Sequence, residues 1–227
     1  MTDTVDLHRI TTGEPGQGPP VVLLHGLGEE ASTWADLTAR LPGRHTIALD
    51  LRGHGASPRP GTYTFDLMVA DVLRALAGTS TVDIVVDIVG HSMGGYVASL
   101  LAGRHPELVR RLVLEDAPVP PESGPSVPDP NPPARPDTPT RFDWAAVGPV
   151  RSAARAPNPQ WWVDIRRLPT PTLLVSGGPA SHLDPARVAE AAGQMPAATF
   201  RTIPVGHDIH TSAPDDFAEL VVPFLAV

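Results

Sequence analysis

One serine stands in a pattern that can turn it into a nucleophile. Ser92 lies at the centre of Gly90–Gly94, which reads G-x-S-x-G. In a nucleophile elbow, such a serine occupies a sharp, strained turn between a strand and a helix. The flanking glycines prevent collisions with neighbouring backbone, and the start of the helix favours negative charge beside the hydroxyl. The pattern also fits a plain glycine-rich turn, so the rest of the chain has to decide between the two interpretations.

A serine hydroxyl is a poor nucleophile near neutral pH, because it needs a base to take its proton and a carboxylate to orient that base. The chain has nine histidines. His207 is the favoured base, because it follows the last apolar stretch and the preceding Gly206 lets the loop turn back toward Ser92. His210 is the nearest rival. His25 and His91 lie in turns, where a histidine more often binds the backbone.

The elements that must position these residues follow from hydrophobic patterns. Short β-branched or apolar runs predict strands, and apolar residues at helical spacing predict helices. The predicted strands are 5–12, 21–24, 46–49, 82–89, 111–115, 172–176 and 198–203. The predicted helices are 32–41, with Ser32 near its cap, 65–76, with Asp66 and Asp71 facing outward, 96–104, 185–194 and 214–224.

Strands and helices alternate, which predicts an α/β fold with a mostly parallel sheet covered on both faces. In such sheets, sites form outside the carboxyl ends of the strands. Five polar residues follow predicted strand ends and should therefore meet at one edge: His25, Asp50, Ser92, Asp116 and His207. Asp87, in contrast, lies inside the central strand, where a carboxylate is costly unless it is paired. No partner for it is evident from the sequence.

Composition narrows the class of protein. The 227 residues suffice for one α/β domain, and the net charge of −8 argues against nucleic acid or an anionic membrane as a partner. The absence of cysteine excludes disulfides and thiolate chemistry. No apolar run approaches a membrane span, and the N-terminus lacks a signal pattern, so we expect a cytoplasmic protein. Ten of the 28 prolines lie between Pro118 and Pro139, which predicts an irregular excursion that leads into Phe142, Trp144, Trp161 and Trp162.

Four motifs in this order resemble the α/β-hydrolase family: His25–Gly28, Asp50-x-Arg52-Gly53-x-Gly55-x-Ser57, Gly90–Gly95 and Val205–His207. The resemblance covers nearly the whole chain and is closest to small, cofactor-free members with a lid between two core strands. It implies a single domain, 1–227, with residues 118–168 as a lid or irregular insertion, and neither a metal nor an organic cofactor.

The resemblance also implies that the catalytic groups follow one another along the chain as serine, acid and histidine. It does not decide which residue is the acid. The family commonly places an Asp after the strand before the last one, and this chain has Ala180 there. Some relatives place the acid one strand earlier, where Asp116 has the matching spacing. Glu115 would then face the opposite side of the strand. Asp184 is the third option, although its place before Pro185 also fits a helix N-cap. We favour Asp116.

The remaining assignments concern binding. The elbow offers the backbone N–H of Met93 to a developing oxyanion, and the resemblance adds the N–H of Leu27. We place His25, Trp144 and Trp162 at the substrate pocket; the lid aromatics could equally pin the lid to the core. The expected function is hydrolysis of a small carboxylic ester or related acyl compound through an acyl-enzyme. A serine at position 92 argues against epoxide hydrolases and haloalkane dehalogenases, which use a carboxylate there.

Two other functions fit the same sequence. One is a non-hydrolytic receptor for a small ligand, or a signalling protein, on the same fold. The other is a C–C hydrolase, lyase or perhydrolase that uses the same site. The sequence specifies neither the natural substrate nor the oligomeric state.

Overall fold

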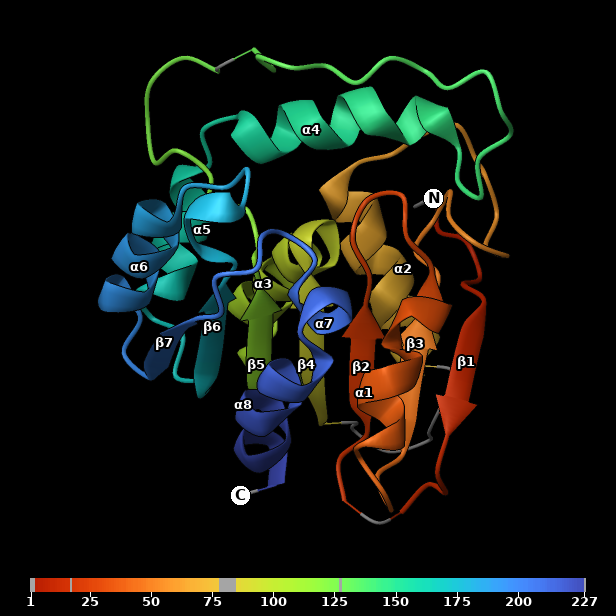
Figure 1. Ribbon diagram of the computed structural model, residues 1–227, viewed down its shortest axis with the longest axis vertical. Coiled ribbons are helices and arrows are strands. Elements are labelled where there is room, and N and C mark those ends of the chain that lie inside the picture. The colour runs from red at the N-terminus through yellow and green to blue at the C-terminus, as the bar shows by residue number, and fades with distance from the viewer. Residues whose placement is uncertain (1–2, 17, 78–84, 127, 227) are drawn as a thin grey trace.

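The computed structural model describes residues 3–16, 18–77, 85–126 and 128–226, and within them the strands form one seven-stranded sheet (Figure 1). The strand order is β1-β3-β2-β4-β5-β6-β7. Only β1 runs antiparallel to its neighbour, so the expected mostly parallel α/β sheet is confirmed. The strands are β1 (Arg9–Thr12), β2 (Val21–Leu24), β3 (Thr46–Leu49), β4 (Val86–His91), β5 (Val109–Glu115), β6 (Thr172–Ser176) and β7 (Ala198–Thr202).

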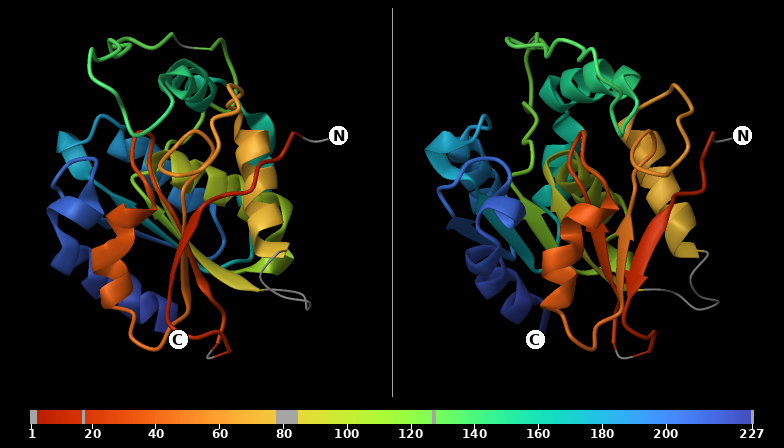
Figure 2. Two further views of the ribbon diagram at one scale, coloured as in Figure 1. Left: turned by 90° about the vertical axis from the view of Figure 1, so that its right-hand side faces the viewer. Right: turned by 45° about the vertical axis from the view of Figure 1, so that its right-hand side comes forward.

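Helices cover both faces of the sheet (Figure 2). On one face lie α1 (Ala35–Ala39), α7 (Ile209–Ser212) and α8 (Pro214–Ala226). On the other lie α2 (Phe65–Ala77), α3 (Ser92–Arg104), α5 (Pro159–Ile165) and α6 (Pro185–Gln194). None of the helices in the described ranges is both long enough and apolar enough to span a membrane.

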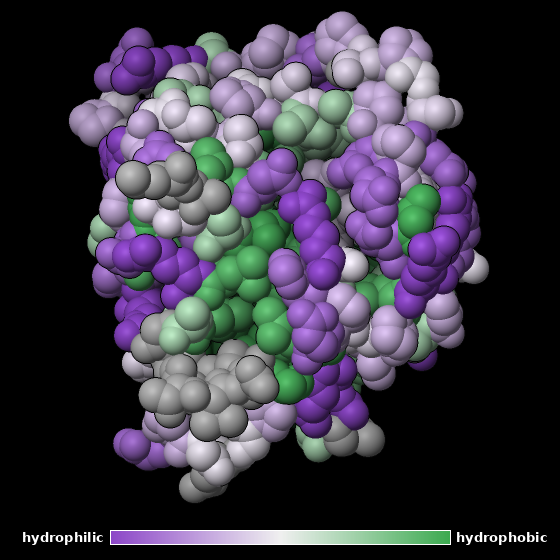
Figure 3. Space-filling model, turned by 180° about the vertical axis from the view of Figure 1, so that it is seen from behind, coloured by the Kyte–Doolittle hydropathy of each residue, from purple (hydrophilic) through white to green (hydrophobic). Residues whose placement is uncertain are grey.

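Alternation along the strands creates two cores. In β2, Val22 and Leu24 pack with α2 and α3, whereas Val21 and Leu23 pack with α1 and α8. Each fully buried aliphatic side chain contributes about 1.5–3 kcal/mol to stability, so a strand that is apolar on both faces is held firmly in place. Seen from behind, hydrophobic residues gather in the middle of the molecule, beside hydrophilic ones (Figure 3).

Several predicted elements have the observed bounds, namely β2, β3, β6 and α6. The central strand differs: residues 82–84 of its prediction lie outside the described residues, and β4 runs from Val86 through His91. Its helix begins at Ser92, four residues before the predicted start at Tyr96. Pattern analysis missed this first turn because it carries Gly94 and Gly95, which disfavour helix in isolation.

Smaller differences concern the flanks. The first strand is limited to Arg9–Thr12, and the helix predicted from Ser32 splits into a 3₁₀ turn, Ala31–Trp34, and α1. Ser32 does not cap it; its hydroxyl donates to the side chain of the N-cap residue, Glu30.

The described part of segment 118–168 has more regular secondary structure than predicted. It contains a 3₁₀ turn at Trp144–Ala146, α4 (Val147–Arg155) and α5. The loop and α4 cross above the carboxyl ends of the strands (Figure 1). By contrast, α5 belongs to the core, because Trp161, Trp162 and Ile165 are buried there. Only the part of the segment that precedes α5 therefore lies over the sheet edge.

Two buried carboxylates have arginine partners. Asp87 accepts hydrogen bonds from Arg44 at 2.6 Å and from Arg110 at 2.8 and 2.6 Å. These contacts supply the pairing that its place in a central strand requires. Asp71, predicted to face outward, is fully buried instead and binds Arg52 at 2.5 and 2.9 Å.

Candidate active site

Ser92 lies at the junction of β4 and α3 in a strained conformation. Its φ is +49°, in the left-handed region that residues other than glycine rarely adopt. The close packing around it explains the two flanking glycines. A Cβ atom on Gly94 would lie 2.2 Å from the carbonyl oxygen of Leu24, and one on Gly90 would lie 2.6 Å from that of Gly94. The local sequence thus forces the turn that exposes the hydroxyl.

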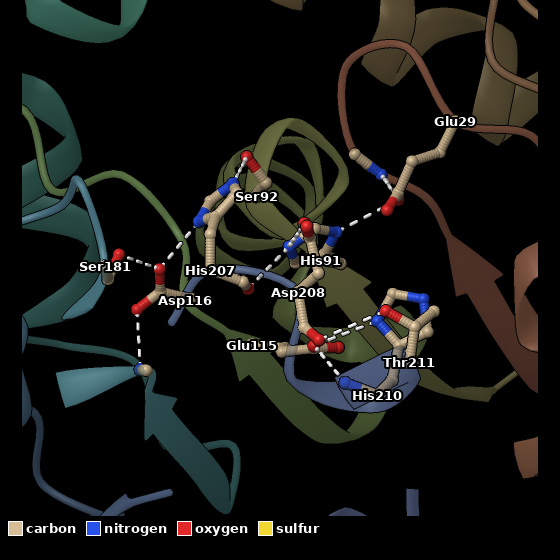
Figure 4. Close-up of polar contacts among 12 residues, drawn as sticks. Glu29, His91, Ser92, Glu115, Asp116, Ser181, His207, Asp208, His210 and Thr211 are labelled. Atoms are coloured by element: carbon tan, nitrogen blue, oxygen red, sulfur yellow. Dashed lines mark hydrogen bonds and ion pairs between the residues drawn. The ribbon is translucent and has the colours of Figure 1, made fainter. Parts of the chain in front are cut away.

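His207 links this hydroxyl to a carboxylate (Figure 4). Its Nε2 lies 2.9 Å from Ser92 Oγ, and its Nδ1 lies 2.7 Å from Asp116 Oδ2. The three residues come from three different strand ends, after β4, β5 and β7. The edge of the parallel sheet therefore brings them together, as the sequence predicts for this fold.

Asp116 is completely buried and held by several donors. Its carboxylate accepts hydrogen bonds from the backbone N–H of Gly177 at 2.8 Å and from the hydroxyl of Ser181. Burial alone would raise the pKa of Asp116, but the hydrogen bonds with His207, Gly177 and Ser181 outweigh it and lower the pKa below its usual value of 3.8. An ionised carboxylate thus faces Nδ1 of His207.

The other two candidate acids have different partners. Glu115 points to the opposite side of β5 and accepts hydrogen bonds from the backbone N–H of His210 at 2.8 Å and from its Nδ1 at 2.9 Å. Asp184 caps α6 by accepting from the N–H of Ala186 at 2.9 Å. Neither carboxylate contacts His207. His210, the rival base, is turned away from Ser92 by its bond to Glu115 (Figure 4).

An ion pair between the buried His91 and the partly buried Glu29 supports the loop that carries His207. His91 Nδ1 lies 3.0 Å from Glu29 Oε2, and His91 Nε2 lies 3.1 Å from the carbonyl oxygen of His207. Burial alone would lower the pKa of His91, but the charge of Glu115 and the bond to Glu29 outweigh it and raise the pKa to about 9. Conversely, Glu29 loses solvation, yet its bond to His91 lowers its pKa to about 2.

A cavity of about 500 Å³ opens beside Ser92. Both candidate oxyanion donors, Leu27 and Met93, line it together with His207. His182 also lies on its wall, with its ring centroid 4.1 Å from that of His207. Burial and the nearby His207 lower the pKa of His182, which keeps it uncharged near neutral pH.

The three residues expected at the substrate pocket lie elsewhere, which corrects that prediction. Trp162 is buried in the core, where its Nε1 donates to the carbonyl of Pro120 at 2.9 Å. His25 is buried too; its Nε2 accepts from the N–H of Leu51 at 2.9 Å, and its Nδ1 donates to the carbonyl of Gly26 at 2.7 Å. Trp144 lines a separate depression of about 410 Å³. Core packing accounts for Trp162 and backbone hydrogen bonds account for His25, whereas the ring of Trp144 lies beside that of Phe142, with the centroids 5.7 Å apart.

One group among the described residues has the spacing of a metal site, formed by His91, His207 and Asp208. The imidazole nitrogens of His207 already bond Ser92 and Asp116, and those of His91 already bond Glu29 and the His207 carbonyl. These existing bonds leave the group poorly suited to hold a metal.

Two features of the site escaped the sequence argument: the Glu29–His91 pair and Ser181. Only Ser181 had a signal, since it lies in the loop after β6 where the family carries its usual acid.

Comparison with known proteins places this geometry in context. The family model described as alpha/beta hydrolase fold matches residues 19–147. The sn-1-specific diacylglycerol lipase ABHD11 of Xenopus laevis is 42% identical over 113 residues, which cover 47% of this chain and 36% of that protein. The protein of the same name from Mus musculus is 28% identical over 253 residues, covering 92% and 81%.

The chain spans only about a third of the length of several curated relatives that it matches. Among solved structures, a hydrolase from Pseudomonas aeruginosa PA01 superposes with a TM-score of 0.82 at 21% identity, covering 100% of this chain and 97% of that one. At this identity the likeness concerns the fold.

Proposed function

Because the chain belongs to the alpha/beta hydrolase fold family, we propose that it is a serine hydrolase that cleaves a small carboxylic ester or related acyl compound. The observation that carries the proposal is the continuous contact from Ser92 through His207 to Asp116, at 2.9 and 2.7 Å. A nucleophile, a base and an orienting carboxylate in hydrogen-bond reach are the groups that acyl transfer requires. The adjoining cavity supports a small-molecule substrate.

In the first half of the reaction, His207 Nε2 takes the proton of Ser92 as Oγ bonds to the carbonyl carbon of the substrate. The negative charge that develops on the carbonyl oxygen is stabilised by the backbone N–H groups of Leu27 and Met93. The ionised Asp116 stabilises the imidazolium and fixes the ring so that Nε2 faces Ser92. His207 then gives its proton to the departing alcohol, which leaves an acyl-enzyme.

In the second half, His207 takes a proton from water, and the resulting nucleophile attacks the acyl carbon. The second oxyanion occupies the same two N–H donors. The proton returns to Ser92 Oγ as the carboxylic acid departs, so the enzyme is regenerated without a metal or a cofactor in any step.

We also infer that residues 1–227 act as one domain, in which the loop from Pro118 and α4 form a lid over the site. Their place above the strand ends supports this (Figure 1). The alternative of a non-hydrolytic receptor was motivated by the missing Asp at position 180. The contact of Asp116 with His207 weakens that motive, since a carboxylate faces the base from the neighbouring strand.

A fluorophosphonate probe tests the nucleophile directly. The wild type and the control Ser212→Ala, which alters an exposed serine at the end of α7, should be labelled, whereas Ser92→Ala should not. Turnover of a short p-nitrophenyl ester by Ser92→Ala should fall by about 10⁴-fold or more, because the three residues act as a unit. Equal labelling of Ser92→Ala and wild type, or a wild type that is neither labelled nor active on esters, would refute the proposal.

A further inference from the structure

Positive charge gathers on the wall of the cavity that contains Ser92. Arg151 and Arg155 of α4 and Arg187 of α6 all line it. Arg151 and Arg155 belong to α4, which crosses above the strand ends (Figure 1), whereas Ser92 begins α3 at the end of β4, and all three residues line the same cavity. Guanidinium groups stay charged at any physiological pH, so these three side chains each carry a positive charge.

Within the protein this charge is only partly compensated. Asp129 binds Arg151 through a short ion pair and lies 3.4 Å from Nη2 of Arg155, so one carboxylate serves two arginines. The other contact of Arg155 is a hydrogen bond from Nη1 to the carbonyl of Arg151 at 3.0 Å. The single negative charge of Asp129 therefore balances only one of the two positive charges of Arg151 and Arg155.

The positive charge of Arg187 is balanced even less than that of Arg155. Its Nη2 donates to the carbonyl of Pro120 at 3.1 Å, and no carboxylate of the described residues forms an ion pair with it. Asp184 is the acidic residue on the same wall, but it is exposed and caps α6. The three arginines thus outnumber the two carboxylates near them, Asp129 and Asp184, although the net charge of the whole chain is −8. A local excess of positive charge in an acidic protein is the pattern of an anion site.

The rest of the wall is mainly apolar. It includes Phe65 and Val150, together with Val119, Ala154 and Val188. A ligand that fills this space therefore meets a nucleophile, apolar side chains and guanidinium groups. A carboxylate pairs well with a guanidinium, which can offer it two parallel N–H donors.

We propose that the substrate carries a carboxylate at the end remote from the scissile bond, and that Arg155 and Arg187 bind it. The proposal rests on the hydrolase function proposed above and narrows its substrate class to amphipathic, anionic acyl compounds. The arginines then have two effects. They attract the anionic substrate into the cavity, and they orient its apolar chain toward Ser92.

Two pairs of esters that differ in one charge test the proposal. Mono-p-nitrophenyl adipate is compared with its methyl ester, which places the charge on the acyl part. The hexanoate ester of 4-hydroxybenzoate is compared with the hexanoate of methyl 4-hydroxybenzoate, which places it on the leaving group. For at least one pair, kcat/KM should favour the anion by about tenfold or more, as expected for a charge-assisted hydrogen bond. The preference should shrink with added salt.

Substitutions locate the preference. In the double variant Arg155→Gln/Arg187→Gln the ratio of anionic to neutral kcat/KM should fall toward one, whereas Arg187→Lys should keep part of it because the charge remains. The control Arg201→Gln removes an exposed arginine of β7 outside the cavity and should keep the wild-type ratio. Thermal unfolding of each variant shows that the comparison concerns folded protein.

The outcomes separate the two proposals. If the wild type hydrolyses the neutral esters through Ser92 but shows no preference in either pair, or if the double variant keeps the preference, the anionic substrate class is wrong and the hydrolase function stands. If the wild type hydrolyses neither pair of esters nor any further p-nitrophenyl ester, the proposed function is wrong, and the proposed substrate class is wrong with it.

Discussion

His91→Gln tests whether a buried imidazolium holds the loop that carries His207. Both ring nitrogens of His91 face acceptors, the carboxylate of Glu29 at 3.0 Å and the carbonyl of His207 at 3.1 Å. A neutral imidazole has one donor only, so satisfying both acceptors requires the doubly protonated, cationic ring. Glutamine keeps an N–H donor for the His207 carbonyl but removes the charge.

The magnitude follows from the pKa of His91. Burial alone would lower it, yet Glu115 and Glu29 raise it from 6.5 to about 9. A pKa that is higher in the folded state gives stability that is fully present below pH 6.5 and is lost as the pH rises through about 9. At about 1.4 kcal/mol per pH unit, this difference corresponds to about 3 kcal/mol. The lowered pKa of Glu29 reflects the same ion pair and is not added to it.

Urea unfolding of wild type and His91→Gln at pH 6 and pH 9 measures this term. The loss of unfolding free energy caused by the substitution should be about 3 kcal/mol larger at pH 6 than at pH 9. The control His105→Gln removes a more exposed imidazole, 3.6 Å from Glu107, and should cost at most about 1 kcal/mol at either pH. An equal cost of His91→Gln at both pH values would mean that the folded protein holds His91 neutral, and the argument would be refuted.

Four further substitutions address the site and its surroundings. Asp116→Asn should lower kcat on a p-nitrophenyl ester by about 10²- to 10⁴-fold, whereas Asp184→Asn should mainly cost about 1 kcal/mol of stability, measured by urea unfolding. Ser181→Ala removes a donor to Asp116 and should lower kcat by about tenfold with little change in KM, read from steady-state kinetics. Trp162→Ala should cost about 3–5 kcal/mol of unfolding free energy and change KM alike for short and long acyl esters, since the indole lies in the core.

Each of these has a contrary result. Full activity of Asp116→Asn would leave a serine–histidine pair without an acid, and a steep loss in Asp184→Asn would move the acid to the loop after β6. Unchanged kcat in Ser181→Ala would make its hydroxyl irrelevant to the acid. A KM effect of Trp162→Ala that grows with acyl chain length would return this residue to the substrate pocket.

Local rules predicted the fold well where a segment is buried on both faces. The runs Val21–Leu24 and Thr172–Ser176 are observed strands with the predicted bounds, because short runs with an apolar centre that are buried on both faces fit the inside of a parallel sheet. The convergence of Ser92, Asp116 and His207 followed from the same logic, since the carboxyl ends of parallel strands share an edge.

Contacts between residues far apart in the chain could not be predicted from local sequence patterns. A buried Asp87 demanded a cationic partner, but its arginines lie 43 and 23 residues away and are fixed by the assembled sheet. Trp162 was expected near the substrate because it follows the proline-rich loop. The tertiary contacts of α5 decide otherwise, as the neighbouring Trp161 shows by donating to Ser99 of α3 at 2.8 Å. Such contacts leave no local pattern to find.

The place of the acid depends on two strand ends together. Asp116 has a φ of +36°, a strained value that persists only when its surroundings fix it. They do: its N–H donates to the carbonyl of Val175 at 2.7 Å, and its carboxylate accepts from Gly177 and Ser181. The loop after β6, which in the resembled family carries the acid, here supplies the donors that hold it. An acid moved to the loop after β6 would therefore leave the N–H of Gly177 and the hydroxyl of Ser181 facing position 116 without the carboxylate that they hold here.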